Sequence, residues 1–165
     1  YFMIDSYKNK ITPSIRNSSN LVKSVKVIKF LLKKNYYVVA LGIKKEKFFN
    51  KLKFKDDKFV RFADLTNKFS LNEQFILAKN SEFYIGSPSG ADFPYKLMNK
   101  KILFFDGIKT KTASRNKKIY WLYKKIKIKK NFVTLSEKNI PNGKFLKLKE
   151  NTFSEIIQLI KEKFI

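Results

Sequence analysis

The sequence predicts an α/β fold in which a parallel sheet carries helices on both of its faces. Three observations lead to this prediction: short apolar runs alternate with amphipathic segments over residues 1–106, the connections are short, and the apolar runs are nearly continuous. Such runs are typical of parallel strands buried on both sides, with helices crossing between them. A length of 165 residues fits one domain over 1–165. Because a strand-like run begins at Tyr1, we expect that an amino-terminal lobe is missing upstream.

The first part of the chain supplies the alternation of strands and helices. Residues 1–4 (YFMI) predict a strand, and residues 21–34 predict a helix with apolar residues on one face and lysines opposite. Residues 36–41 (YYVVAL) predict a second strand, 45–54 a short helix and 59–64 a third strand. The apolar face of the helix over 21–34 comprises Leu21, Val25, Ile28, Leu31 and Leu32.

The middle of the chain continues the pattern with a recognisable helix cap. Residues 71–80 predict a helix capped by Ser70, because Glu73 follows three positions later at the spacing of a capping box. Residues 82–86 (EFYIG) then predict a strand, and 90–99 predict a short helix. This order again fits a helix crossing between parallel strands.

The pattern is less regular after the strand predicted over 101–106 (KILFFD). Residues 107–118 are polar and basic and predict an exposed loop, whereas 119–130 mix aromatic residues with lysines and give no clear element. Residues 132–135 predict a further strand. Residues 152–165 repeat apolar side chains at helical spacing and predict a carboxyl-terminal helix.

The composition excludes several kinds of chemistry. The chain contains no cysteine and no histidine, which removes disulfides, thiolate or imidazole metal sites and histidine-based catalytic triads. We therefore expect no metal site and no cofactor. A general base within this chain would have to be an acid, a tyrosine or a perturbed lysine.

The net charge of +24 raises the question of an anionic partner. Only three of the 37 basic residues are arginine, the side chain preferred for phosphate and base contacts, and the lysines are spread along the whole chain. We therefore favour a solvated lysine surface over nucleic-acid binding. A third alternative is attraction to an anionic membrane surface, for which residues 123–130 (YKKIKIKK) are a basic candidate, although an edge strand or charged loop is the preferred interpretation.

The stretch YIGSPSGADFPYKL over 84–97 gathers two of the five glycines with two serines directly after an apolar run. Glycine allows a phosphate to approach the backbone, serine hydroxyls can donate to it, and the amino terminus of a following helix favours anions. The alternative is an ordinary strand-to-helix turn with Ser89 as the helix cap. The stretch fits neither the dinucleotide-binding pattern GxGxxG nor the phosphate-binding loop GxxxxGK[ST].

Residues 70–106 resemble the carboxyl-terminal half of GT-B-type glycosyltransferases, in which a helix leads into a strand that ends in an IGxxSG loop. More closely, the chain is similar to a bacterial glycosyltransferase family associated with surface-polysaccharide genes. The matching stretches are IRNSSNLVKSVKVIKFLLKKNYYVVALG, EFYIGSPSGAD, NFVTLSE and ENTFSEIIQLIKEKF. One departure is the pair Ala40 and Leu41, where that family usually has arginine and methionine.

The resemblance implies a Rossmann-like domain, the carboxyl-terminal lobe of a GT-B fold, that binds a nucleotide-sugar as substrate. Arg16 is then the catalytic cation that neutralises the leaving diphosphate, with an ordinary surface arginine as the alternative. The implied donor-binding residues are Ser87, Ser89, Gly90, Ala91, Asp92, Asn17 and Glu73.

Some of these residues have a structural alternative. Asp92 either accepts hydrogen bonds from sugar or ribose hydroxyls or stabilises the first turn of its helix. For Glu73 a capping role is favoured over contact with the ribose. Asp64 and Asp5, which each follow a predicted strand, are weaker candidates.

The implied function is metal-independent transfer of a sugar from a nucleotide-diphosphate donor to a glycan or lipid-linked acceptor in surface-polysaccharide synthesis. The expected location is cytoplasmic, with peripheral contact at the inner face of the membrane. In such enzymes the catalytic base usually comes from the amino-terminal lobe, so this chain alone can be incomplete. The alternatives are a basic α/β module that binds nucleic acid and a catalytically inactive structural relative.

Overall fold

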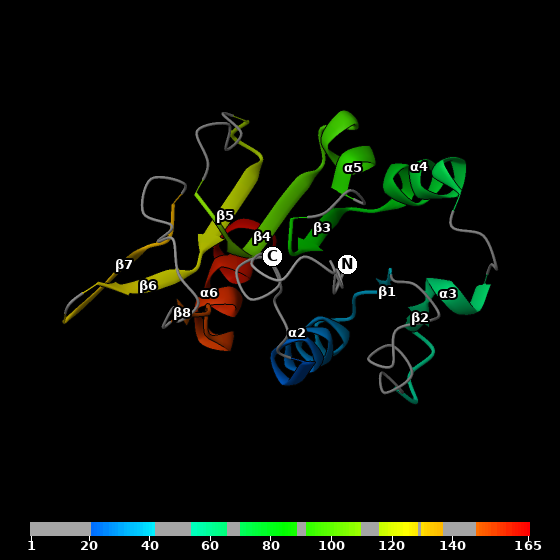
Figure 1. Cartoon of the computed structure of the whole chain (residues 1–165). Coiled ribbons are helices and arrows are strands. Elements are labelled where there is room, and N and C mark those ends of the chain that lie inside the picture. The colour runs from blue at the N-terminus through cyan, green and yellow to red at the C-terminus, as the bar shows by residue number, and fades with distance from the viewer. Residues whose placement is uncertain are drawn as a thin grey trace.

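The computed structural model describes residues 21–41, 54–65, 70–88, 92–109, 116–128, 130–136 and 148–165. These residues form a mixed α/β structure in which strands are paired in small sheets and helices pack on them (Figure 1). The mixed α/β class predicted from the sequence is therefore confirmed. The predicted strand over 1–4 lies outside the described residues, and so does the predicted helix over 45–54 except for its last residue.

Five strands are paired in parallel, in two groups. Strand β1 (Val38–Ala40) pairs with β2 (Phe59–Arg61), and β3 (Phe83–Gly86), β4 (Lys101–Gly107) and β5 (Ile119–Tyr123) form a three-stranded sheet with β4 at its centre. Parallel pairing requires a crossover connection, and between β3 and β4 the helix α5 (Phe93–Leu97) lies in that connection. The parallel pairing predicted from the apolar runs is thus confirmed for β1 with β2 and for β3 with β4.

Helices cover both faces of the sheet β3–β4–β5. Helices α2 (Leu21–Lys33) and α6 (Phe153–Lys163) contribute to one hydrophobic cluster, and α4 (Leu71–Asn80) and α5 (Phe93–Leu97) contribute to the other. The central strand separates these clusters because successive side chains point to opposite faces. Leu103 and Phe105 of β4 join the α2 and α6 side.

The central strand is fully buried on both faces. Ile102 and Phe104 of β4 join the α4 and α5 side, and all four consecutive side chains from Ile102 to Phe105 have 0% exposure. A strand in this environment can only be apolar, since an unpaired polar group there would lose its hydration. The run KILFFD therefore forms the core strand that the sequence predicts.

Two helices begin with a complete capping box. At α4 the Ser70 hydroxyl accepts from the backbone N–H of Glu73 at 3.2 Å, and the Glu73 carboxylate accepts from the Ser70 N–H at 2.9 Å. Thr152 and Glu155 make the same pair of bonds at the start of α6, at 3.2 and 2.7 Å. Each box satisfies two N–H groups that lack partners within the helix. The cap of α4 confirms the sequence prediction for Ser70 and Glu73.

The strand predicted over 59–64 is too long. It ends at Arg61 and is followed by the short helix α3 (Phe62–Leu65). The Arg61 guanidinium contacts the Asp64 carboxylate at 2.5 Å across one helical turn, and Phe62 is buried against the cluster of α4 and α5. This turn directs Phe62 into the core.

Helix α5 is also shorter than the helix predicted over 90–99. It begins at Phe93, with a proline in its first turn, and it ends at Leu97. Asn99 has a φ of 51°, a left-handed conformation that ends the helix. The Lys100 N–H closes the turn by donating to the Tyr95 carbonyl at 3.0 Å.

A second, antiparallel sheet follows the parallel one. Strand β6 (Lys125–Ile128) lies between β7 (Asn131–Thr134) and β8 (Leu148–Lys149). The sequence predicts a strand close to β7, but it gives no clear element over 119–130, which contains β5 and β6. In Figure 1 strands β6 and β7 extend away from the rest of the molecule.

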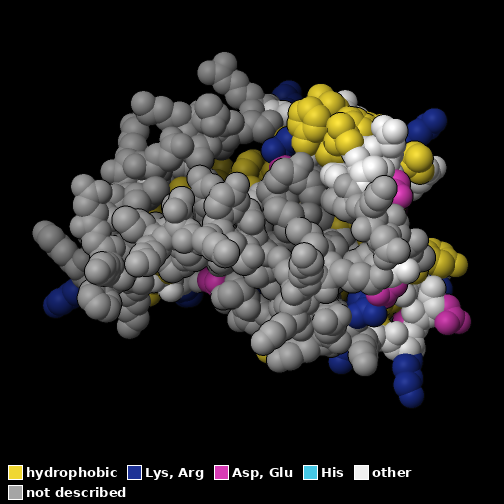
Figure 2. Space-filling model, turned by 45° about the vertical axis from the view of Figure 1, so that its right-hand side comes forward, with side chains coloured by type: hydrophobic (Ala, Val, Ile, Leu, Met, Phe, Trp, Pro, Cys, Tyr) yellow, Lys and Arg dark blue, Asp and Glu magenta, His cyan; other side chains and the backbone are white. Residues whose placement is uncertain are grey.

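Within the described parts of the chain, exposed lysines occur on several different helices and strands. Figure 2 shows dark blue side chains at several points around one face and an apolar group near its top. Within the described residues, no helix combines the length and apolar character needed to cross a bilayer.

The cap of α6 also determines how the protein responds to acid. The carboxylate of Glu155 accepts from the backbone N–H of Thr152 at 2.7 Å, from its hydroxyl at 3.0 Å and from the Lys125 ammonium at 3.4 Å. The Thr152 backbone bond is the main cause that lowers the pKa of Glu155 below its usual 4.5, and burial partly opposes it. The ionised carboxylate therefore stabilises the folded state.

We expect Glu155→Gln to be less stable than the natural chain at neutral pH. Because the folded pKa is lower than the unfolded value of 4.5, the stabilisation is complete above 4.5 and is lost as pH falls through the folded pKa. Urea unfolding at neutral and strongly acidic pH measures the difference in free energy of unfolding between the two proteins. That difference should disappear in acid; a difference that is constant with pH would contradict a role for the charge.

Candidate functional site

The parallel strands bring three chain segments to one edge of the sheet, which we call the carboxyl edge. It comprises Ser87 after β3, Asp106 and Gly107 at the end of β4, and Tyr123 at the end of β5. Gly86 pairs with Phe104, so β3 ends close to the last residues of β4. Open α/β sheets bind their ligands at this kind of edge.

The segment after β3 is the first part of this edge. Ser87 is 6% exposed, and its carbonyl accepts from the hydroxyl of Tyr84 at 3.4 Å. Asp92 lies at the cap position of α5 but makes no side-chain cap bond to the helix. Its carboxylate is 2.5 Å from the ammonium of Lys96, one turn further on. The structure thus brings Asp92 beside a cation of its own helix.

A β-bulge shapes the end of β4. Phe104 pairs with Trp121 and Gly107 with Tyr123, so three residue steps on β4 match two on β5. Within the bulge Asp106 has a φ of 54°, a conformation that aspartate tolerates better than most residues. A bulge re-aims a side chain relative to regular alternation. At this bulge the side chain of Asp106 contacts residues on the face of the sheet that α2 and α6 cover.

A buried network of charged and polar groups surrounds Asp106. The ammonium of Lys23 donates to the Asp106 carboxylate, to Glu150 at 3.2 Å and to the carbonyl of Asn151 at 3.1 Å, which uses all three of its N–H donors. Asp106 and Asn151 exchange two further bonds, each 2.6 Å long, between backbone N–H and side-chain oxygen. The Asn151 amide also donates to the carbonyl of Tyr123 at 3.1 Å.

This network joins elements that are far apart in the sequence. Lys23 belongs to the first turn of α2, Asp106 ends β4, and Glu150 and Asn151 precede α6. Because Lys23 is hydrogen-bonded to Asp106, the amino-terminal turn of α2 lies at the carboxyl edge. The side chains of Lys23 and Asp106 are 5% and 0% exposed, so the pair is shielded from water.

A second lysine is buried nearby. Lys124 is 1% exposed, and its backbone N–H donates to the Gly107 carbonyl at 2.9 Å. Burial lowers the pKa of Lys124 below its usual 10.5, while Asp106 and Glu150 oppose that shift and Lys23 adds to it. The balance of two ammonium and two carboxylate groups at this edge limits the cost of burying charge.

The remaining predicted residues are distributed between described and undescribed parts of the chain. Glu73 is engaged in the capping box of α4, as favoured from the sequence. Asp64 contacts Arg61 at 2.5 Å. The predicted residues that lie outside the described ranges are Arg16, Asn17, Ser89, Gly90, Ala91 and Asp5. Within those ranges no group of three or more acids is placed to hold a metal ion.

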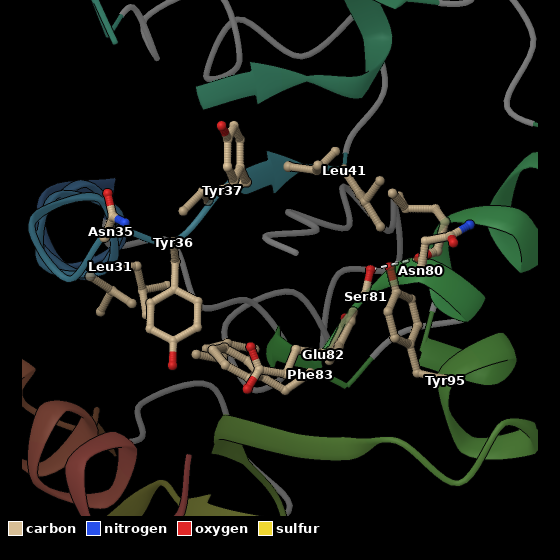
Figure 3. A pocket seen from close by; sticks show the side chains of 16 residues that line it. Leu31, Asn35, Tyr36, Tyr37, Leu41, Asn80, Ser81, Glu82, Phe83 and Tyr95 are labelled. Atoms are coloured by element: carbon tan, nitrogen blue, oxygen red, sulfur yellow. Dashed lines mark hydrogen bonds between the residues drawn. The ribbon is translucent and has the colours of Figure 1, made fainter. Parts of the chain in front are cut away.

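The described cavity lies elsewhere. Figure 3 shows this space of about 470 Å³ between β1 and β3, with Tyr36, Phe83 and Tyr95 among its lining residues. Burial raises the pKa of Tyr95 to about 12, although a hydrogen bond with Ser81 opposes the shift. Neither Ser87 nor Asp92 lines this cavity. This cavity is therefore lined by residues other than Ser87 and Asp92, and it is not part of the site at the carboxyl edge.

The sequence predictions miss the network itself. They place the lysines of residues 21–34 opposite the apolar face, which is wrong for Lys23, since it is buried together with Ser24 on the side of Val27 and Ile28. One signal is present in the sequence, because Lys23 precedes Val27 by a single helical turn. Asp106 also ends a continuous apolar run, which marks the end of a buried strand.

Comparisons of the chain with protein-family models, with curated proteins and with solved structures found no match. The resemblance to glycosyltransferases therefore stays a prediction. A function for this chain has to be inferred from the geometry of the carboxyl edge.

We expect Asp106→Ala to destabilise the protein by about 3 kcal/mol or more, because it leaves the buried ammonium of Lys23 without its closest carboxylate. Glu150→Ala is the matched control. The Glu150 side chain is 29% exposed, so its loss should cost about 1 kcal/mol or less. Urea unfolding measures both. Equal losses in the two variants would contradict the central place of Asp106 in the network.

Proposed function

We propose that this chain is the donor-binding half of a glycosyltransferase, with a Rossmann-like sheet whose carboxyl edge receives a nucleotide-diphosphate sugar. The observation that carries the proposal is that the end of β3, the end of β4 and the amino-terminal turn of α2 meet at one edge. Parallel strands with helices on both faces bind ligands at such an edge. The motif residues Ser87 and Asp92 belong to the same part of the fold.

The network explains how α2 would support this site. Lys23 and Asp106 hold the start of α2 against the end of β4, and Arg16 and Asn17 lie five and four positions before Leu21, the first residue of that helix. We propose that the segment before α2 supplies a cation to the diphosphate. Lys23 itself is surrounded by Asp106, Glu150 and Asn151, so its role is to position the helix rather than to contact the donor.

The chemistry requires stabilisation of a departing negative charge. In sugar transfer the bond from the anomeric carbon to the diphosphate oxygen breaks, and the acceptor oxygen forms a new bond to that carbon while losing its proton to a base. Hydrogen-bond donors and one cation that bind the diphosphate more tightly as its charge develops lower the barrier. We propose Arg16 as that cation and Ser87 and Ser89 as donors. The proton acceptor would come from the amino-terminal lobe that the resemblance implies.

We expect UDP or GDP to raise the melting temperature of the chain by about 5–10 °C when the nucleotide is present at about 100 times its Kd. In Arg16→Ala and Ser89→Ala this increase should be lost or strongly reduced. Differential scanning fluorimetry measures the shift, and Lys29→Ala on the exposed side of α2 is the control that removes one positive charge elsewhere.

Three outcomes would contradict the proposal. Indifference to every nucleoside diphosphate, with the fold intact, would favour an inactive structural relative. If Lys29→Ala lost the increase in melting temperature equally, the effect would reflect the overall positive charge of the protein rather than a specific site. Tight, steeply salt-dependent binding to oligonucleotides without a nucleotide response would instead support a nucleic-acid-binding module.

A further inference from the structure

The antiparallel sheet has one apolar face and one basic face. Residues directly opposite each other on paired strands point to the same side. Ile126 is opposite both Val133 and Leu148, and it is buried with Leu135 as the centre of a small apolar cluster. The residues on the other side, which we call the lysine face, are Lys125, Lys127, Phe132, Thr134 and Lys149.

The lysine face concentrates positive charge. Lys125 lies directly opposite Lys149, and Lys127 lies directly opposite Phe132. Like charges opposite each other in a sheet are destabilising. Glu155 offsets this only in part, because its carboxylate is 3.4 Å from Lys125 and both side chains are exposed to water. A binding partner with negative charge would relieve the repulsion.

The outer strand β7, which lies next to the lysines of β6, carries exposed apolar side chains. Phe132 and Val133 are 42% and 37% exposed, and they point to opposite faces of the strand because they are neighbours in it. The ammonium of Lys149 lies over the Phe132 ring, 5.7 Å from its centre. In Figure 1 the hairpin of β6 and β7 projects from the rest of the molecule.

We propose that the hairpin of β6 and β7, with Lys149 of β8, docks on an anionic membrane surface. The ammonium groups of Lys125, Lys127 and Lys149 contact lipid phosphates, while Phe132 and Val133 enter the interface between headgroups and acyl chains. A nucleic acid fits less well. Base stacking uses an open ring face, and with Lys149 over one face of Phe132 it is confined to the other face. Apolar side chains on both faces of an outer strand suit insertion between lipid headgroups better than stacking against bases.

The test is co-sedimentation of the whole chain with vesicles of phosphatidylcholine alone or with an equal part of phosphatidylglycerol. We expect binding only to the anionic vesicles. Lys127→Gln/Lys149→Gln should bind about thirtyfold more weakly, from about 1 kcal/mol per lysine near an anionic surface. Phe132→Ser should lose the part of the binding that persists at high salt, because apolar insertion is insensitive to screening.

Matched controls separate this surface from the general charge of the protein. Lys29→Gln/Lys161→Gln removes the same charge from exposed positions of α2 and α6, and Tyr37→Ser removes an aromatic side chain that is 77% exposed. Both should bind almost as the natural chain does. Equal losses in the controls would overturn the proposal, as would equal binding to neutral vesicles. A preference for single-stranded oligonucleotides that depends on Phe132 would assign the face to nucleic acid instead. Nucleotide binding at the carboxyl edge is measured separately and does not enter this test.

Discussion

The ion pair between Lys23 and Asp106 is the contact on which the arrangement of the parallel half depends. It joins α2 to the central strand at a position from which water is excluded, and Asn151 connects the same group to β5 and to the start of α6. Burying two charges is costly unless their hydrogen-bonding groups are satisfied. The three acceptors around Lys23 provide this, and the apolar cluster of α2, α6 and the sheet packs beside them. The polar contacts determine how α2 is oriented on the sheet, whereas burial of apolar side chains supplies most of the free energy of folding.

Much of the fold can be predicted from local patterns in the sequence. The helices α2, α4 and α6 are predicted almost to their bounds, because apolar spacing and two capping boxes specify them locally. Strand β4 is predicted because a short apolar run between turns is typical of a strand buried on both faces. Strand β5 is not predicted, and over 123–130 the sequence leaves an edge strand or a charged loop open, whereas β6 is the central strand of its sheet. In IYWLYKKIKIKK the apolar residues of one strand run directly into the alternating pattern of the next, and only Lys124 separates them.

The candidate site is predicted less completely, for a physical reason. Ser87 and Asp92 can be found because they belong to one local motif of small and polar residues. Lys23, Asp106 and Asn151 come together only through the tertiary fold, and their composition resembles the rest of a lysine-rich chain. The left-handed backbone of Asp106 depends on a bulge, and no pattern within KILFFDG announces one. From the sequence, Asp106 can be recognised only as the end of a strand. Its partners depend on how α2 and the start of α6 pack against that strand.

The same network places a constraint on how the protein is made. Lys23 and Asn151 are 128 positions apart, so this acceptor of the Lys23 ammonium is synthesised 128 residues after the lysine itself. At synthesis rates of about 5–20 residues per second, this delay is roughly 6 to 25 seconds. During that time α2 has no completed α6 cluster to cover it. Until those acceptors have been made, α2 lacks the polar partners that hold its first turn at the carboxyl edge.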